Sequence, residues 1–71
     1  MRDIEFQIDG DYIELIKLLK VTHLTVSGAE AKHMVESGVV LRNGEAESRK
    51  RAKITSGETI QIEGVATIRT T

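Results

Sequence analysis

The sequence predicts an α+β fold in which two short helices pack on a small, mostly antiparallel sheet. Apolar and polar residues alternate near both ends of the chain, which is the period of a half-buried strand. Between these ends, two segments carry apolar residues at the spacing of an amphipathic helix, and each begins with a capping signal. Because 71 residues are enough for one domain only, we expect residues 1–71 to form a single unit.

The N-terminal part is expected to contain a strand followed by a helix. In residues 3–8 every second side chain is apolar, so one face of this strand should meet the core. A turn signal follows at 9–11, and Asp11 with Glu14 three residues later has the pattern of a capping box. We therefore expect a helix over residues 12–20. Its apolar positions are Tyr12, Leu15, Ile16 and Leu19.

The second helix is predicted to begin at Ser27, because a glutamate follows this serine three residues later in another capping-box pattern. It should end near residue 37, since Gly38 is typical of the left-handed position after a helix. The link over 21–26 is expected to place Leu24 or Val26 in the core. The apolar positions of the second helix are Ala31, Met34 and Val35.

The C-terminal half is predicted to be mainly β-structure. A short strand over 39–42 leads into Asn43-Gly44, the strongest short signal for a hairpin turn. The charged segment 45–53 is expected to be a return strand and a loop. Strands over 59–63 and 65–69 should pair with each other, and pairing of the last strand with the N-terminal strand is a further possibility.

Charge is distributed very unevenly along the chain. The formal net charge is −1, which by itself argues against a nucleic-acid ligand. However, residues 1–16 contain five acids and one base, whereas residues 42–53 contain five bases and two acids. A local basic patch can bind phosphates because electrostatic fields act over a Debye length of about 8 Å. The five bases are Arg42, Arg49, Lys50, Arg51 and Lys53.

Several classes of function are disfavoured. The chain has no cysteine, and His23 and His33 do not make a four-ligand metal site without unusually placed carboxylates. No set of residues suggests a catalytic centre, and no glycine-rich phosphate loop is present, so we expect neither enzymatic activity nor a cofactor or small-molecule substrate. No apolar run approaches the roughly 18 residues of a membrane span, and the N-terminus does not have the features of a signal peptide. We therefore expect a cytoplasmic protein with no membrane partner.

The order of these features resembles the alpha-L RNA-binding domain, named after a ribosomal protein of the S-four family. The resemblance covers about residues 12–63 and is strongest to stand-alone bacterial proteins of this family. It implies an alpha-L motif made of two helices and a basic hairpin loop, binding of RNA, and no catalysis in a chain without an attached enzyme domain. The matching segments are 12–20, 27–32, 38–40, 43–45, 47–51, Lys53 and 54–60.

The predicted ligand is structured RNA, with ribosomal RNA and tRNA as candidate classes. Backbone N–H groups at the start of the second helix carry partial positive charge, and a glycine there permits close approach of a phosphate. Arginine can bind phosphate through two parallel hydrogen bonds. Because the two aromatic residues, Phe6 and Tyr12, are predicted to lie in the core, base stacking is not expected. The candidate RNA-binding residues are Ser27, Gly28, Ala29, Lys32, Arg42, Arg49, Lys50, Arg51 and Lys53.

Two other functions fit parts of the pattern. Two helices and a hairpin also occur in winged helix-turn-helix DNA-binding proteins, although the second helix has only Lys32 and His33 beside its two acids. A β-grasp-like protein-interaction module is the third possibility, although the chain ends in Arg-Thr-Thr and not in the Gly-Gly of a sulfur carrier. Ser27 also has a purely structural explanation as a helix cap.

Overall fold

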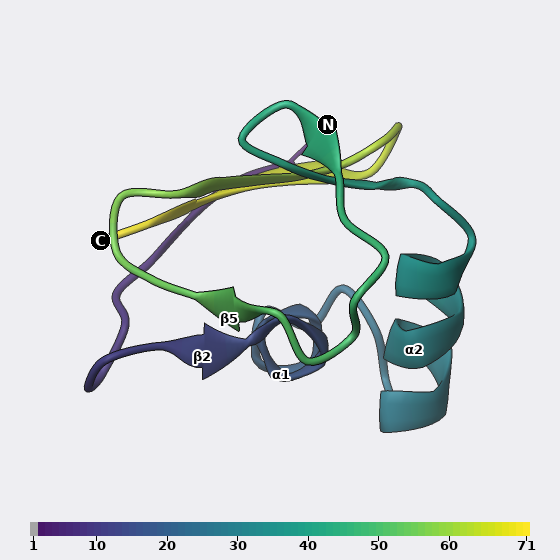
Figure 1. Cartoon of the computed structure of the whole chain (residues 1–71), viewed down its shortest axis with the longest axis horizontal. Helices are drawn as coiled ribbons and strands as arrows, with labels where there is room; N and C mark the ends of the chain where they lie inside the picture. The colour runs from purple at the N-terminus through teal and green to yellow at the C-terminus, as the bar shows by residue number, and fades with distance from the viewer. Residues whose placement is uncertain (1) are drawn as a thin grey trace.

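The computed structural model describes residues 2–71 and has two layers: a sheet and, on one of its faces, two helices (Figure 1). This arrangement confirms the predicted α+β class with two short helices on a mostly antiparallel sheet. The elements are β1 (Arg2–Phe6), β2 (Ile13–Glu14), α1 (Leu15–Val21), α2 (Gly28–Glu36), β3 (Val40–Arg42), β4 (Glu45–Ala46), β5 (Lys53–Ile54), β6 (Thr59–Ile62) and β7 (Ala66–Thr70).

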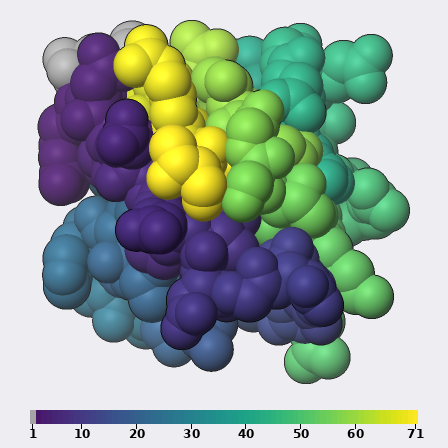
Figure 2. All heavy atoms as spheres, turned by 90° about the vertical axis from the view of Figure 1, so that its left-hand side faces the viewer, coloured from purple at the N-terminus to yellow at the C-terminus, as the bar shows by residue number. Residues whose placement is uncertain are grey.

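The main sheet has five strands in the order β1-β7-β6-β3-β4. All neighbouring strands are antiparallel except β1 and β7, which run parallel with Ile4 opposite Ile68. The last strand therefore pairs both with its predecessor and with the N-terminal strand, so that the first and last strands of the chain lie side by side (Figure 2). A separate two-stranded sheet joins β2 to β5 beside the start of α1.

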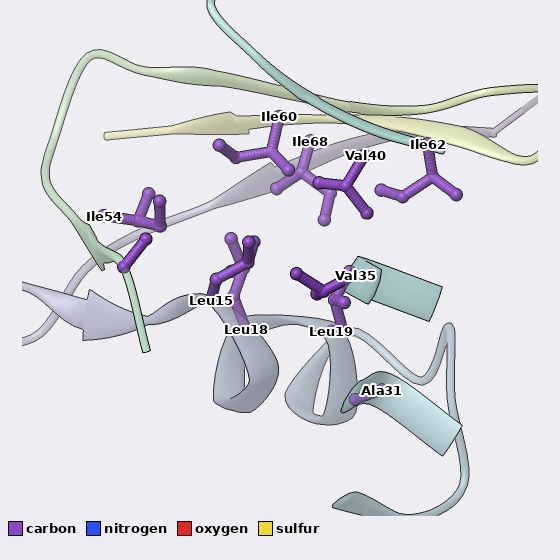
Figure 3. Packing of buried hydrophobic residues seen from close by; sticks show 11 residues of the cluster. Leu15, Leu18, Leu19, Ala31, Val35, Val40, Ile54, Ile60, Ile62 and Ile68 are labelled. Atoms are coloured by element: carbon purple, nitrogen blue, oxygen red, sulfur yellow. The ribbon is translucent and has the colours of Figure 1, made fainter. Parts of the chain in front are cut away.

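The core lies between the inner face of the main sheet and the two helices (Figure 3). Aliphatic side chains fill it, as expected for a chain without cysteine. Alternate residues of β6 and β7 point inward, which is the two-residue period expected from the sequence. The fully buried aliphatic side chains are Leu15, Leu18, Leu19, Val35, Val40, Ile54, Ile60, Ile62 and Ile68.

The first helix begins later than predicted. Ile13 and Glu14 have extended backbone and pair with Ile54 and Lys53, so the helix starts at Leu15. The expected capping box of Asp11 with Glu14 is absent, because this strand pairing holds the segment extended. The strand also moves Tyr12 out of the helix, and its exposure of 44% contradicts its predicted place in the core.

Helix α1 ends in a Schellman motif without the usual glycine. The backbone N–H of Leu24 donates to the carbonyl of Leu19, and that of His23 donates to Lys20. His23 takes the left-handed conformation at this position, with φ of 62°. Leu24 then packs against the core, whereas Val26 is 90% exposed, so the apolar plug of the link is Leu24.

The local signals for α2 and the hairpin turn are confirmed. Ser27 Oγ accepts a hydrogen bond of 3.2 Å from the backbone N–H of Glu30, and Gly38 follows the helix with φ of 84°. The Glu30 carboxylate accepts from the N–H of Val26, one residue before the position expected in a capping box. Asn43 and Gly44 both have positive φ, as a type I′ turn between β3 and β4 requires.

Truncating a fully buried side chain of α1 should destabilise the protein strongly. We expect Leu18→Ala to lower the free energy of unfolding by roughly 2–5 kcal/mol, because it leaves a cavity in a small core. Val26→Ala is the matched control, since its exposed side chain should change stability by less than about 0.5 kcal/mol. Urea denaturation followed by circular dichroism measures both, and equal midpoints for the two variants would contradict this packing.

Candidate nucleic-acid interface

The segment 47–52 between β4 and β5, here called the basic loop, is fixed to the start of α1. No side chain caps this helix. Instead, the backbone N–H of Leu15 donates to the carbonyl of Ala52, and that of Ile16 donates to Lys50, each at 3.0 Å. These bonds satisfy two of the N–H groups that a helix leaves unpaired at its first turn. The loop is therefore part of the helix cap and has a defined path.

Arg42, at the end of β3, is the centre of an ion-pair network. Its guanidinium donates from Nε and Nη2 to both carboxylate oxygens of Glu58, at 2.6 and 3.0 Å. It also donates from Nη1 to Glu47 and from Nη2 to the carbonyl of Lys53. These bonds use four of the five N–H donors of an arginine, and the side chain is 24% exposed. Arg42 therefore has little capacity left for an external ligand.

The Glu58 carboxylate, in the turn before β6, is the second main member of this network. Besides Arg42, it accepts hydrogen bonds from the backbone N–H and hydroxyl of Thr55 and from the amide of Asn43. The hydrogen bonds from Arg42 and, to a smaller extent, those from Thr55 lower the pKa of Glu58 to about 2, although burial opposes this shift. The carboxylate is therefore ionised throughout the physiological range.

Glu47, at the start of the basic loop, is also a buried carboxylate. Its Oε2 accepts from Nε of Arg49 at 3.1 Å and from the Arg49 backbone N–H at 3.2 Å. Its Oε1 accepts from Nη2 of Arg49 at 3.1 Å and from Arg42 at 3.3 Å. Bonding to Arg49 is the largest cause that lowers the pKa of Glu47 to about 2. The Arg49 side chain nevertheless remains 73% exposed.

Two shallow hollows of about 350 and 360 Å³ lie beside this network. Arg42 and Arg49 line both of them. The first is lined by three carboxylates as well, those of Glu45, Glu47 and Glu58. The second has no acidic lining among the described residues, and its other lining residues are Arg51, Ala52 and Lys53. The carboxylates therefore face one side of the two arginines, and further cations face the other.

Three cations of the basic loop and β5 form no ion pair within residues 2–71. Arg51 and Lys53 are exposed, and Lys50 is half-buried. Nζ of Lys53 lies 5.1 Å from the centroid of the Tyr12 ring, within range of a cation–π interaction. The free positive charge of the basic loop and of β5 is therefore provided by these three residues.

The remaining predicted site residues lie at the start of α2. Ser27, Ala29 and Lys32 are exposed, and Gly28 is half-buried. A methyl group at Gly28 would meet no atom within 4 Å, and its φ is outside the left-handed region, so the fold does not require glycine there. Helix α2 packs against α1, the helix that the basic loop caps. Both parts of the predicted site therefore have α1 as their common support.

The described chain contains no group of three His, Cys, Asp or Glu side chains able to hold a metal ion. Within the same residues, no helix has the length and apolar character needed to cross a bilayer.

The buried carboxylates should make stability depend on pH in the acid range. Glu47 and Glu58 have pKa values of about 2 in the folded chain, below their ordinary value of 4.5, so protonation favours the unfolded state. We expect the free energy of unfolding to fall as pH decreases from about 5 to 2. Glu58→Gln should reduce this loss and also cost roughly 1–3 kcal/mol at pH 7, because Arg42 loses its main partner.

Glu63→Gln is the matched control for this experiment, since Glu63 is exposed and has no ion pair among residues 2–71. Urea denaturation between pH 2 and pH 7 should give this variant the same acid dependence as the wild type. If Glu58→Gln also kept the full acid dependence, the Glu58 carboxylate would not be part of a stabilising network.

Comparison with known proteins identifies the family. The sequence matches the S4 domain family over residues 6–70. YbcJ of Escherichia coli (strain K12) is 42% identical over 53 residues, which cover 75% of this chain and 76% of YbcJ, and the YbcJ protein of Shigella flexneri matches equally well. The solution structure of E. coli YbcJ, described as having an alpha-L motif involved in RNA binding, superposes with a TM-score of 0.68 and 34% identity. That superposition covers 92% of this chain and 85% of YbcJ. With a family match over nearly its whole length, this chain belongs to the S4 domain family.

Proposed function

We propose that the protein binds structured RNA through phosphate and shape contacts and catalyses no reaction. The S4 domain match and the alpha-L motif described for YbcJ support an RNA ligand. Within this chain, the supporting observation is the hollow of about 360 Å³ with four cationic side chains around Ala52. A phosphate group there would meet arginine and lysine donors and no carboxylate of the hollow's lining. The four cations are Arg42, Arg49, Arg51 and Lys53.

The residues of this site have different proposed roles. Arg51, Lys50 and Lys53 are the direct phosphate contacts, because no carboxylate of the described chain is paired with them. Arg49 contributes the part of its guanidinium that faces away from Glu47. Arg42 has a supporting role, since most of its donors already bind within the protein.

The start of α2 is the second proposed contact. Its first N–H groups, at Gly28 and Ala29, are free to face a phosphate, and Lys32 lies one turn further along the helix. The open space at Gly28 supports this role, because a side chain is absent where the fold would tolerate one. Ser27 caps the helix and adds a hydroxyl at the same place.

We propose ribosomal RNA or tRNA as the ligand class and the cytoplasm as the location. A-form helices present their phosphates and 2′-hydroxyls on a shaped surface, which a rigid arrangement of cations can recognise without base contacts. The one exposed aromatic ring in residues 2–71, that of Tyr12, lies beneath Lys53, so no platform for successive stacked bases is available.

Binding should prefer structured RNA and weaken with salt. Three or four phosphate contacts give a slope of log affinity against log salt of roughly −3. Fluorescence anisotropy with an RNA hairpin and a DNA duplex of the same sequence, between 50 and 300 mM salt, measures both the preference and the slope. Equal affinity for the two ligands at every salt concentration would contradict an alpha-L RNA-binding function and favour a general polyanion or DNA binder.

Charge reversal should separate the proposed contacts from the rest of the surface. Lys32→Glu on α2 should weaken RNA binding more than Lys17→Glu on α1, although both change the net charge by two units and both side chains are exposed. Phosphate contacts are local, whereas a diffuse electrostatic attraction depends only on net charge. Anisotropy titrations at one salt concentration compare the two variants. Equal losses would remove α2 from the interface and leave the basic loop as the contact.

A further inference from the structure

Arg49 is bound to Glu47 on one edge of its guanidinium and open on another. Nε and Nη2 donate to the two oxygens of Glu47, which is the side-on arrangement of an arginine–carboxylate pair. Nη1 makes no hydrogen bond to any residue of the described range, 2–71. Because a guanidinium can also bind an oxyanion end-on, through Nη1 and Nη2, Arg49 retains the donors for one further partner.

The orientation of this open edge is fixed by the surrounding network. Glu47 is only 8% exposed, and it is held by Arg42 and by the Arg49 backbone N–H as well as by the Arg49 side chain. Arg49 lines both hollows, with the carboxylates on one side and Arg51 and Lys53 on the other. Glu47 therefore binds Arg49 from the acidic side and leaves the open edge of the guanidinium available to a ligand in the hollow that Arg51 and Lys53 line.

Glu47 also affects the charge that a distant polyanion experiences. A carboxylate paired at 3.1 Å cancels most of the field of Arg49 beyond a few ångströms, whereas direct contact at the open edge still gains two N–H donors. Non-specific binding depends on the number of uncompensated cations, whereas selective binding depends on where the donors are placed. Glu47 thus weakens non-specific binding of polyanions and supports selective binding.

We propose that Glu47 is a positioning residue that determines the selectivity of the interface, by orienting Arg49 toward one phosphate of a structured RNA and cancelling its charge toward other polyanions. This inference rests on the proposed RNA-binding function. It assigns a role in RNA recognition to an acidic residue that itself contacts no phosphate.

The test compares Glu47→Gln with Glu45→Gln, using the RNA hairpin and the DNA duplex described above. Both variants raise the net charge by one, and Glu45 is exposed on β4 and forms no ion pair within the described chain. Glu47→Gln should lower the ratio of RNA affinity to DNA affinity by roughly tenfold, the effect of misplacing one charge-assisted contact. It should also steepen the salt slope for DNA by about 0.9, because one more cation becomes uncompensated. Glu45→Gln should keep the wild-type ratio.

Arg49→Lys gives an independent answer, including the case in which Glu47→Gln does not fold. Arg49 is mostly exposed, so the lysine variant should keep the fold. It loses the guanidinium, which can bind Glu47 on one edge and a phosphate on the other. RNA affinity should fall several-fold, and DNA affinity should change less than twofold because the charge is retained. An unchanged RNA-to-DNA ratio in a folded Glu47→Gln or in Arg49→Lys would overturn the inference. If the wild type itself did not bind the RNA hairpin, the proposed function would fail instead.

Discussion

The first turn of α1 lies under the sheet and has no side chain to cap its N–H groups, and the basic loop supplies the missing carbonyls. These hydrogen bonds place Lys50 and Ala52 directly at the start of the helix. They also explain why a seven-residue helix, too short to be stable alone, has a defined beginning. The path of the loop and the position of β5 are tied to this point, because β5 directly follows the loop and pairs with β2, the strand that leads into the helix. The charged residues of the loop are therefore held in place by backbone hydrogen bonds to a helix whose side chains form the core.

The basic residues of the segment 42–53 fall into two groups: those held in ion pairs within the fold and those without such a partner. Two of the five bases in the segment 42–53 are paired with buried carboxylates, and the other three are not. Buried ion pairs of this kind stabilise a fold only when each charge has full hydrogen bonding, and Glu58 with its five donors meets that condition. A count of basic residues in the sequence consequently overestimates the charge available to a ligand.

The sequence predicted those parts of the fold that depend on local chemistry. The serine cap of α2, the glycine after it and the Asn43-Gly44 turn each act within a few residues, and all three were correct. The start of α1 was wrong because its local signal competes with the pairing of Glu14 and Lys53, which are far apart in the chain. The role of Glu58 was not predictable, since glutamate is rarely buried and only the finished sheet brings Glu58 to Arg42. Which of the candidate residues touch RNA stays a prediction.

The parallel pairing of β1 with β7 has a consequence for the order in which the protein folds. Arg2 lies opposite Ala66, so the first strand has no partner until the last strand has been synthesised. At a translation rate of roughly 5–20 residues per second, several seconds pass between the synthesis of β1 and that of β7. During this time the backbone N–H and C=O groups of β1 lack the strand with which they pair in the folded chain. Asp3 and Glu5 precede the apolar residues Ile4 and Phe6 in this strand, and charged side chains of this kind disfavour pairing with other strand edges. The pairing of β1 with β7 thus makes completion of this edge of the sheet depend on the strand synthesised last among those of the described chain.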